Sequence, residues 1–152
     1  MTAARFGTEL ARHALVGLDT AVLIYHLDDT KPYSALTETA FMAIAAGRPS
    51  GIVSTISLAE LLVKPYADGR IDRVDAIEAF VASLPNVRLV APAAGPAREA
   101  ARLRARYGLR MPDALVIATA KNEGAGAVVT NDRDLRRVKA EGLTVLVLSD
   151  YA

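Results

Sequence analysis

The sequence has no cysteine and no tryptophan among its 152 residues, and only 5% of the residues are aromatic. The lack of cysteine excludes disulfides and thiolate metal sites. Because the only histidines are His13 and His26, any bound metal ion must be held mostly by oxygen atoms. Apolar residues make up 52% of the chain and are mostly Ala, Val and Leu. This composition suits helices packed on a buried sheet.

The chain also lacks an excess of either charge and a long apolar run. Its 18 basic and 17 acidic residues give a net charge of +1, so net charge alone indicates no nucleic-acid partner. The first residues carry Glu9 and Arg12 and lack the apolar stretch of a secretory signal. The apolar run at 14–27 is broken by Asp19 and His26, and it is shorter than the ~20 residues that span a bilayer. These absences predict a cytoplasmic protein without a membrane segment.

Short apolar runs alternate with helical patterns along the chain. Strands are predicted at residues 14–18, 51–55, 87–92, 127–130 and 143–148. Helices are predicted at residues 33–46, 57–67, 72–83, 96–107, 112–123 and 134–140. A glycine follows five of these helical patterns, as is common where helices end: Gly47, Gly69, Gly108, Gly124 and Gly142. The alternation predicts one α/β domain over residues 1–152, with a mainly parallel sheet of four to five strands.

Four acidic residues fall at equivalent places in this pattern. Asp19 follows the first predicted strand, and Asp132 follows the fourth. Glu60 lies in the first turn of the helix after the second strand, and Asp113 opens the helix that leads into the fourth. Ligands of parallel α/β sheets bind in the crevice beyond the carboxyl ends of the strands. The four acids are therefore predicted to meet at this edge.

Each acid also has a purely local explanation. Asp19 and Asp132 could each cap a helix. Ser57 and Glu60 match a capping box, in which the glutamate reaches back to the serine amide. Asp113 would be favoured in a first helical turn by about 0.3–1 kcal/mol through the helix dipole. Local stability does not, however, require all four acids at one edge of the sheet.

Carboxylates gathered at one place repel each other unless a cation binds between them. Two like charges ~4 Å apart repel by about 4 kcal/mol at an effective dielectric of ~20. Mg²⁺ and Mn²⁺ favour carboxylate and water oxygens. Such an ion lowers the pKa of a water nucleophile and can steady a leaving oxygen in phosphoryl transfer. The acids therefore indicate a divalent-metal site suited to phosphoryl transfer.

Four segments, taken in order, resemble the motifs of PIN-domain ribonucleases, specifically the VapC-type toxins of type II toxin–antitoxin systems. They are LDTAVLIY (18–25), STISLAELL (54–62), RMPDALVIATA (110–120) and VVTNDRDL (128–135). The resemblance spans nearly the whole chain and implies a three-layer α/β/α fold with Mg²⁺- or Mn²⁺-dependent endoribonuclease activity. It also implies an RNA substrate, a homodimer, and a VapB-type antitoxin that shields the acidic pocket.

The resemblance assigns the catalytic, metal-binding set residue by residue. Asp19 and Asp113 are the expected principal metal ligands, and Glu60 is expected to hold or orient a metal-bound water. Asp132 is expected to complete the pocket, with Asp134 as the alternative, because NDRD offers two acids. An alternative to the nuclease is a PIN fold kept as an interaction module without catalysis, although the presence of all four acids argues against it.

Hydroxyl and guanidinium groups complete the predicted site. Thr20 and Thr130 are expected to orient ligand carboxylates. Arginines recur every four residues on one helical face, and a further arginine follows Asp132; they are Arg98, Arg102, Arg106 and Arg133. They form either a phosphate-binding surface or an ordinary solvated helix face. Residues 1–13 form a longer segment than such toxins usually carry before the first strand, and the sequence assigns it no role.

Overall fold

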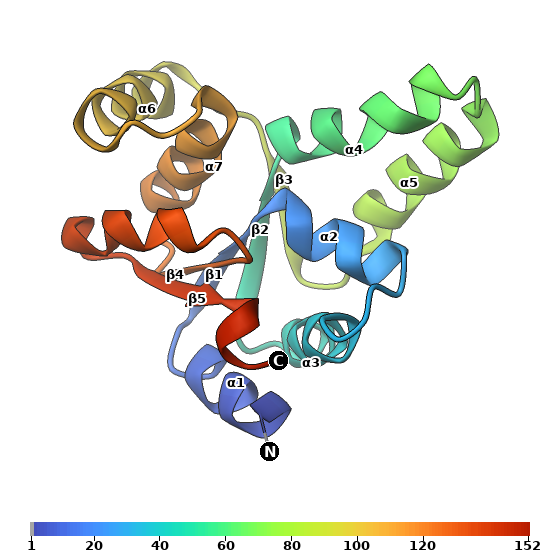
Figure 1. The fold of residues 1–152 in the computed structure, drawn as a ribbon, viewed down its shortest axis with the longest axis horizontal. Coiled ribbons are helices and arrows are strands. Elements are labelled where there is room, and N and C mark those ends of the chain that lie inside the picture. The colour runs from blue at the N-terminus through green and yellow to red at the C-terminus, as the bar shows by residue number, and fades with distance from the viewer. Residues whose placement is uncertain (1) are drawn as a thin grey trace.

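The computed structural model describes residues 2–152 and is built on a five-stranded sheet in the order β3-β2-β1-β4-β5 (Figure 1). All strand pairs are parallel. The strands are β1 (Leu15–Leu18), β2 (Ser50–Ser54), β3 (Val87–Val90), β4 (Ala127–Thr130) and β5 (Thr144–Val147). Each overlaps one of the predicted strands. All four residues of β4 are buried, as expected of a central parallel strand covered on both faces.

Helices cover both faces of this sheet. They are α1 (Thr2–Leu10), α2 (Thr20–Leu27), α3 (Ser34–Ala45), α4 (Thr55–Ala67), α5 (Ile71–Ser83), α6 (Ala94–Tyr107), α7 (Met111–Asn122) and the 3₁₀ segments η1 (Arg133–Glu141) and η2 (Leu148–Asp150). One core packs the first five helices, α1 through α5, against the sheet, with side chains such as Leu23 and Ile44. A second core joins α6, α7 and η1 to the other face, through Leu103 and Ile117. The predicted three-layer α/β/α fold is confirmed.

Helix α2 (Thr20–Leu27) was not predicted, because the first strand was predicted to end at residue 18 and no element was assigned to the apolar residues after Asp19. Asp19 separates the two elements. Its backbone is extended (φ −74°, ψ 160°), and its side chain accepts a hydrogen bond from the Thr20 amide, so it caps α2. The chain therefore turns from strand to helix at the acidic residue itself.

Helix α1 gives a structural role to most of the N-terminal segment, for which the sequence predicted none. Phe6 and Leu10 are fully buried. The Phe6 ring lies 5.2 Å from the ring of Tyr151, near the C-terminus, and the Arg5 guanidinium lies 5.2 Å from the centre of the same ring. Figure 1 shows α1 beside α3 and near the C-terminus, at the edge opposite the carboxyl ends of the strands.

Glycine determines how closely α7 packs on the sheet. A Cβ atom at Gly17 would lie 2.7 Å from the Ala120 Cβ and 3.2 Å from the Val128 Cγ2. The first distance is shorter than real Cβ contacts and the second is tight, so glycine in β1 lets α7 lie directly on the strand. The five glycines that follow helices have φ between 67° and 98°, which agrees with their predicted place at helix ends.

Across residues 2–152, every helix is too short or too polar to cross a membrane.

Candidate active site

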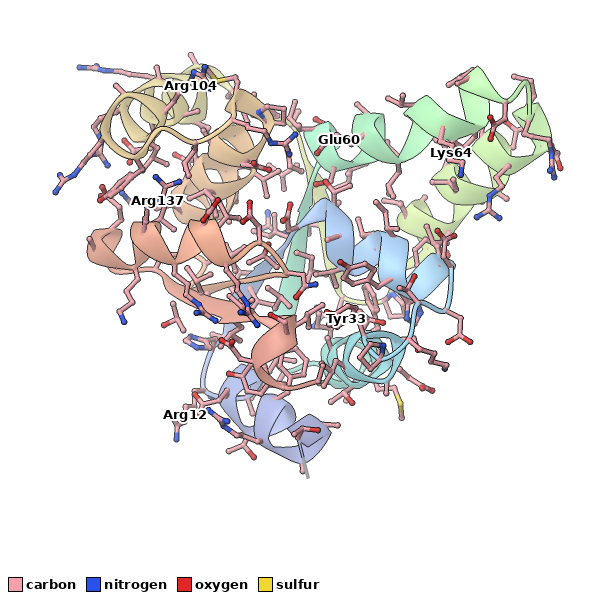
Figure 2. All side chains as sticks on the ribbon, viewed as in Figure 1. Arg12, Tyr33, Glu60, Lys64, Arg104 and Arg137 are labelled. Carbon is pink, nitrogen blue, oxygen red and sulfur yellow. The ribbon has the colours of Figure 1, made fainter. Side chains whose placement is uncertain are left out.

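The four predicted acids line a single cavity of about 330 Å³. It lies at the carboxyl ends of β1 and β4, which pair directly with each other. β1 also pairs with β2 on its other side, so the cavity lies where the crossover connections diverge, the usual ligand site of such sheets. Figure 2 shows Glu60 near the start of α4, on the side that faces α7.

Asp19 is the most constrained of the acids. Its side chain is nearly buried, and its residue is only 7% exposed. Oδ1 accepts a hydrogen bond from the Thr20 amide at 2.8 Å, and Oδ2 accepts one from the Thr130 hydroxyl at 2.7 Å. Burial raises the pKa of Asp19, the two hydrogen bonds oppose this, and the nearby charges of Asp113 and Glu60 raise it further. The site therefore disfavours this negative charge unless a cation is present.

Glu60 is held by a hydroxyl group from another helix. The Thr20 hydroxyl donates to Glu60 Oε1 at 2.8 Å, and the Ser57 Oγ lies 3.0 Å from the same hydroxyl. The capping-box interpretation of Ser57 and Glu60 is wrong, because α4 begins earlier. Ser54 caps this helix and accepts a hydrogen bond from the Ile56 amide at 3.1 Å. Glu60 is thus free of the helix end and faces the cavity.

Asp113 lies in the first turn of α7 and pairs with an arginine that was not predicted as a site residue. Arg110 Nε and Nη2 donate to the two carboxylate oxygens at 3.0 Å and 3.3 Å. The hydrogen bonds and charge of Asp113 raise the pKa of Arg110, with smaller contributions from the charges of Glu60 and Asp132. The i,i+3 spacing of an arginine and an aspartate was the available sequence signal for this pair.

Asp132, and not Asp134, lines the cavity. Asp132 accepts a hydrogen bond from the Asp134 amide at 2.9 Å and so caps η1. The Asp132 amide in turn donates to the Thr130 hydroxyl at 3.1 Å. Asn131, also not predicted, lines the cavity and donates to the Tyr25 hydroxyl at 3.0 Å. The two threonine hydroxyls therefore hold different acids: that of Thr130 holds Asp19, whereas that of Thr20 holds Glu60.

The carboxylate oxygens of the four acids are suitable ligands for a hard divalent ion, but the side chains are not positioned to bind one together. All four acids border the same cavity, and all offer oxygen. Within residues 2–152, however, no three acidic or histidine side chains are grouped closely enough to hold one ion. Each carboxylate instead contacts a neighbour: Asp19 contacts Thr20 and Thr130, Glu60 contacts Thr20, Asp113 contacts Arg110, and Asp132 contacts the Asp134 amide. Metal binding therefore requires some of these side chains, or their present partners, to move.

The arginine surface predicted from sequence is only partly available. Arg98 and Arg106 are exposed on α6, and Arg106 lies 5.4 Å from the centre of the Tyr107 ring. Arg133 is exposed and donates to the Ser149 hydroxyl at 3.1 Å. Acidic side chains already hold the guanidinium of Arg102, so it is less available to phosphate than that of Arg98 or Arg106, and its phosphate-binding role stays a prediction.

Arg102 belongs to an ionic network that joins α6, α7 and η1. It pairs with Glu99 at 2.7 Å and with Glu141 at 2.8 Å. Lys121 of α7 pairs with the same two glutamates at 2.8 Å and 3.3 Å. The Tyr107 hydroxyl donates to Glu141 at 2.8 Å. The hydrogen bonds from Arg102, followed by those from Lys121 or Tyr107, lower the pKa of Glu99 and of Glu141 to about 2.

This network predicts a loss of stability in acid. Because both glutamates have a pKa of about 2 in the folded chain and about 4.3 when unfolded, their contribution is complete above roughly pH 5 and is lost as the pH falls towards 2. Glu141→Gln is expected to lower the free energy of unfolding at pH 7 by about 1 kcal/mol, as for partly exposed ion pairs, and to flatten its dependence on pH. Urea unfolding between pH 3 and 7 measures both effects. Glu78→Gln, at an exposed position on α5, is the control and should change neither.

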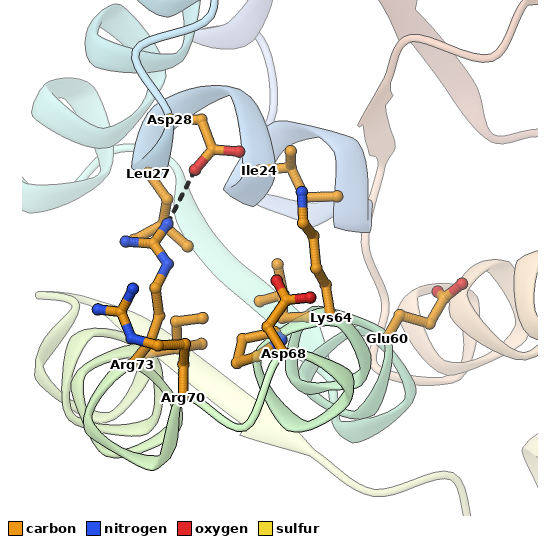
Figure 3. Close-up of a pocket in the computed structure, with 11 residues that line it drawn as sticks. Ile24, Leu27, Asp28, Glu60, Lys64, Asp68, Arg70 and Arg73 are labelled. Carbon is orange, nitrogen blue, oxygen red and sulfur yellow. Dashed lines mark hydrogen bonds and ion pairs between the residues drawn. The ribbon is translucent and has the colours of Figure 1, made fainter.

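A second cavity of about 300 Å³ lies beside the acidic one, between α2, α4 and α5 (Figure 3). Its apolar floor includes Leu27, Leu61 and Ile77. Charged side chains surround it, with Arg73 paired to Asp28 at 3.0 Å. Ile24 and Glu60 line both cavities, and Figure 3 shows Glu60 pointing away from the other labelled residues of the groove. The groove and the acidic cavity are therefore neighbours.

The family model of the PIN domain matches residues 16–141. The chain belongs to the PIN domain family. No curated protein matches it in sequence.

Solved structures share this fold at low sequence identity. VapBC2 from Rickettsia felis, bound to a promoter DNA fragment, is 18% identical, with a TM-score of 0.69 over 86% of this chain and 96% of that chain. VapBC-5 from Mycobacterium tuberculosis is 24% identical, with a TM-score of 0.60 over 88% and 98%. VapC20 from M. tuberculosis, a toxin that cleaves the Sarcin-Ricin loop, is 16% identical, with a TM-score of 0.59 over 74% and 86%. At these identities the similarity establishes the fold alone.

Proposed function

We propose that this chain is a VapC-type toxin that hydrolyses RNA phosphodiester bonds with the help of Mg²⁺ or Mn²⁺. The observation that carries the proposal is the meeting of four acids, remote in sequence, around one cavity at the carboxyl ends of β1 and β4. The match to the PIN domain and the fold shared with VapBC complexes and with a Sarcin-Ricin loop cleaving toxin support it.

Each residue of the cavity would have a distinct role in the reaction. A bound divalent ion supplies Lewis acidity and lowers the pKa of a water molecule. Asp19 and Asp113 would hold the ion, and the Thr130 hydroxyl fixes the orientation of Asp19. Thr20 positions Glu60, which can accept a hydrogen bond from the attacking water. Asp132 lies exposed at the cavity, where it would add a further oxygen ligand or hold a second water.

The partner in this proposal is a VapB-type antitoxin that binds the groove between α2, α4 and α5. The groove has an apolar floor and opens beside the acidic cavity through the shared residues Ile24 and Glu60. Ile24 is 38% exposed, so its side chain is available to a bound helix. An antitoxin segment lying there would block the access of RNA to the acids. The proposal also includes a homodimer and a cytoplasmic location.

A cleavage assay tests this function. Purified protein is expected to cut unstructured RNA in the presence of Mg²⁺ or Mn²⁺. Cleavage should stop when EDTA is added and should resume when the metal is restored. Antitoxin should stop cleavage by the unaltered chain but not by a Leu27→Glu variant, because Leu27 lines the groove and not the acidic cavity, and a charge there opposes apolar contact. Cleavage that EDTA leaves unchanged would contradict the metal mechanism.

The alternative is a PIN-fold interaction module without catalysis, and a Mn²⁺ titration distinguishes it from the proposed nuclease. A nuclease should bind Mn²⁺ in a manner that depends on Asp113, whereas a module without a working site should show no such dependence.

A further inference from the structure

Arg110 places a positive charge where the proposed function requires a metal ion. Its guanidinium spans both oxygens of Asp113, at 3.0 Å and 3.3 Å. Among the described residues that line the acidic cavity, Arg110 alone is basic. The negative charges of Glu60 and Asp132 also favour the charged form of this guanidinium. A bidentate arginine satisfies a carboxylate strongly, so Asp113 cannot bind a metal ion through the same lone pairs while this pair is intact.

We propose that Arg110 is an exchangeable cation: it holds Asp113 while the site lacks a divalent ion, and it holds an RNA phosphate once the ion takes Asp113. This inference rests on the proposed function, since it requires that Asp113 bind the ion. It adds Arg110 as a substrate-binding residue that acts through its own guanidinium.

The position of Arg110 allows such an exchange without repacking of the core. Its side chain is 72% exposed, whereas that of Asp113 is 11% exposed. Arg110 directly precedes α7 and has an extended backbone (φ −63°, ψ 147°). The guanidinium can therefore move into solvent while Asp113 stays fixed on its helix. The next side chains behind Asp113, Ala114 and Ile117, are fully buried and hold that helix in place.

The cavity explains why the released arginine would turn to phosphate. Four carboxylates border the space, so an approaching phosphate is repelled until positive charge is supplied. When the ion neutralises Asp113, Arg110 loses its partner but stays at the rim. Its planar fork of donors matches phosphate oxygens as well as carboxylate oxygens. The ion and the arginine would then face the same RNA backbone from two sides.

Arg110→Ala should therefore move two affinities in opposite directions. Removal of the competing cation is expected to tighten Mn²⁺ binding about fivefold, the range of a partly exposed ion pair. Removal of the phosphate contact is expected to raise KM for RNA about tenfold with a smaller change in kcat. Calorimetric Mn²⁺ titration and steady-state cleavage measure these effects. Arg106→Ala, an exposed arginine beside Tyr107, removes the same charge and should change Mn²⁺ affinity little.

The exchange itself is visible in the Arg110 side chain. The Nε–H group donates to Asp113, so its NMR signal should exchange slowly with water in EDTA and fast in saturating Mg²⁺. A signal that stays protected in Mg²⁺, or an Arg110→Ala variant with unaltered Mn²⁺ affinity, overturns the exchange. In that case Asp113-dependent Mn²⁺ binding by the unaltered chain leaves the proposed function intact. An unaltered chain that binds Mn²⁺ no better than Asp113→Asn overturns both.

Discussion

Asp19→Asn is expected to reduce metal-dependent RNA cleavage by about 100-fold, since loss of even the groups that orient metal ligands commonly costs about 10–100-fold in metal affinity or activity. Asp19 is the acid that the fold holds most firmly, through the Thr20 amide and the Thr130 hydroxyl. Asparagine keeps the shape of the side chain but offers one neutral oxygen. The loss should therefore appear in catalysis and in Mn²⁺ affinity.

The same change is expected to leave the metal-free fold at least as stable as before. Burial and the nearby charges of Asp113 and Glu60 raise the pKa of Asp19, so its ionised form opposes folding at neutral pH. Asparagine removes that charge. Thermal unfolding in EDTA and initial cleavage rates in Mn²⁺ measure the two effects in one set of samples.

Asp134→Asn is the matched control for this experiment. Asp134 is exposed on η1 and does not line the acidic cavity, so this variant should retain most of the activity. Full activity of Asp19→Asn, or an equal loss in both variants, would contradict the assignment of the site.

Phe6→Ala is expected to lower the free energy of unfolding by about 3–5 kcal/mol, the usual cost of removing a buried aromatic ring. Phe6 is fully buried, and its ring packs on that of Tyr151. It belongs to the core that includes Ile44 of α3 and Leu148 of η2. The truncation would leave a cavity between the two ends of the chain and α3.

The effect of Phe6→Ala should be confined to stability. Because α1 lies at the edge of the sheet opposite the acids (Figure 1), the folded fraction of the variant should cleave RNA at the unaltered rate. Urea unfolding gives the stability, and cleavage at low temperature gives the rate per folded molecule. Thr8→Ala, at an exposed position of the same helix, is the control. A Phe6→Ala variant as stable as the unaltered chain would show that α1 does not hold the core together.

The sequence by itself determined which segments form the parallel strands and at which edge of the sheet the acids lie, but not the order of the strands. Each strand overlaps an apolar run short enough for a buried parallel strand, and apolar runs of this kind reflect local burial on both faces. The acids directly follow strands (Asp19, Asp132) or lie near the starts of helices (Glu60, Asp113) at one edge, because parallel strands share a direction. Whether they bind a metal ion stays a prediction.

Only the tertiary structure decided which neighbour each charged side chain takes. The Thr130–Asp19 and Thr20–Glu60 hydrogen bonds join residues 111 and 40 positions apart, and Arg102 reaches Glu141 across 39 positions. Such contacts depend on how closely helices pack on the sheet, as at Gly17, where a methyl group would strike Ala120. The periodicity of the sequence indicates which face of its helix or strand a side chain lies on. It does not give the distance from that side chain to one on another helix or strand. That distance is set when the whole core packs.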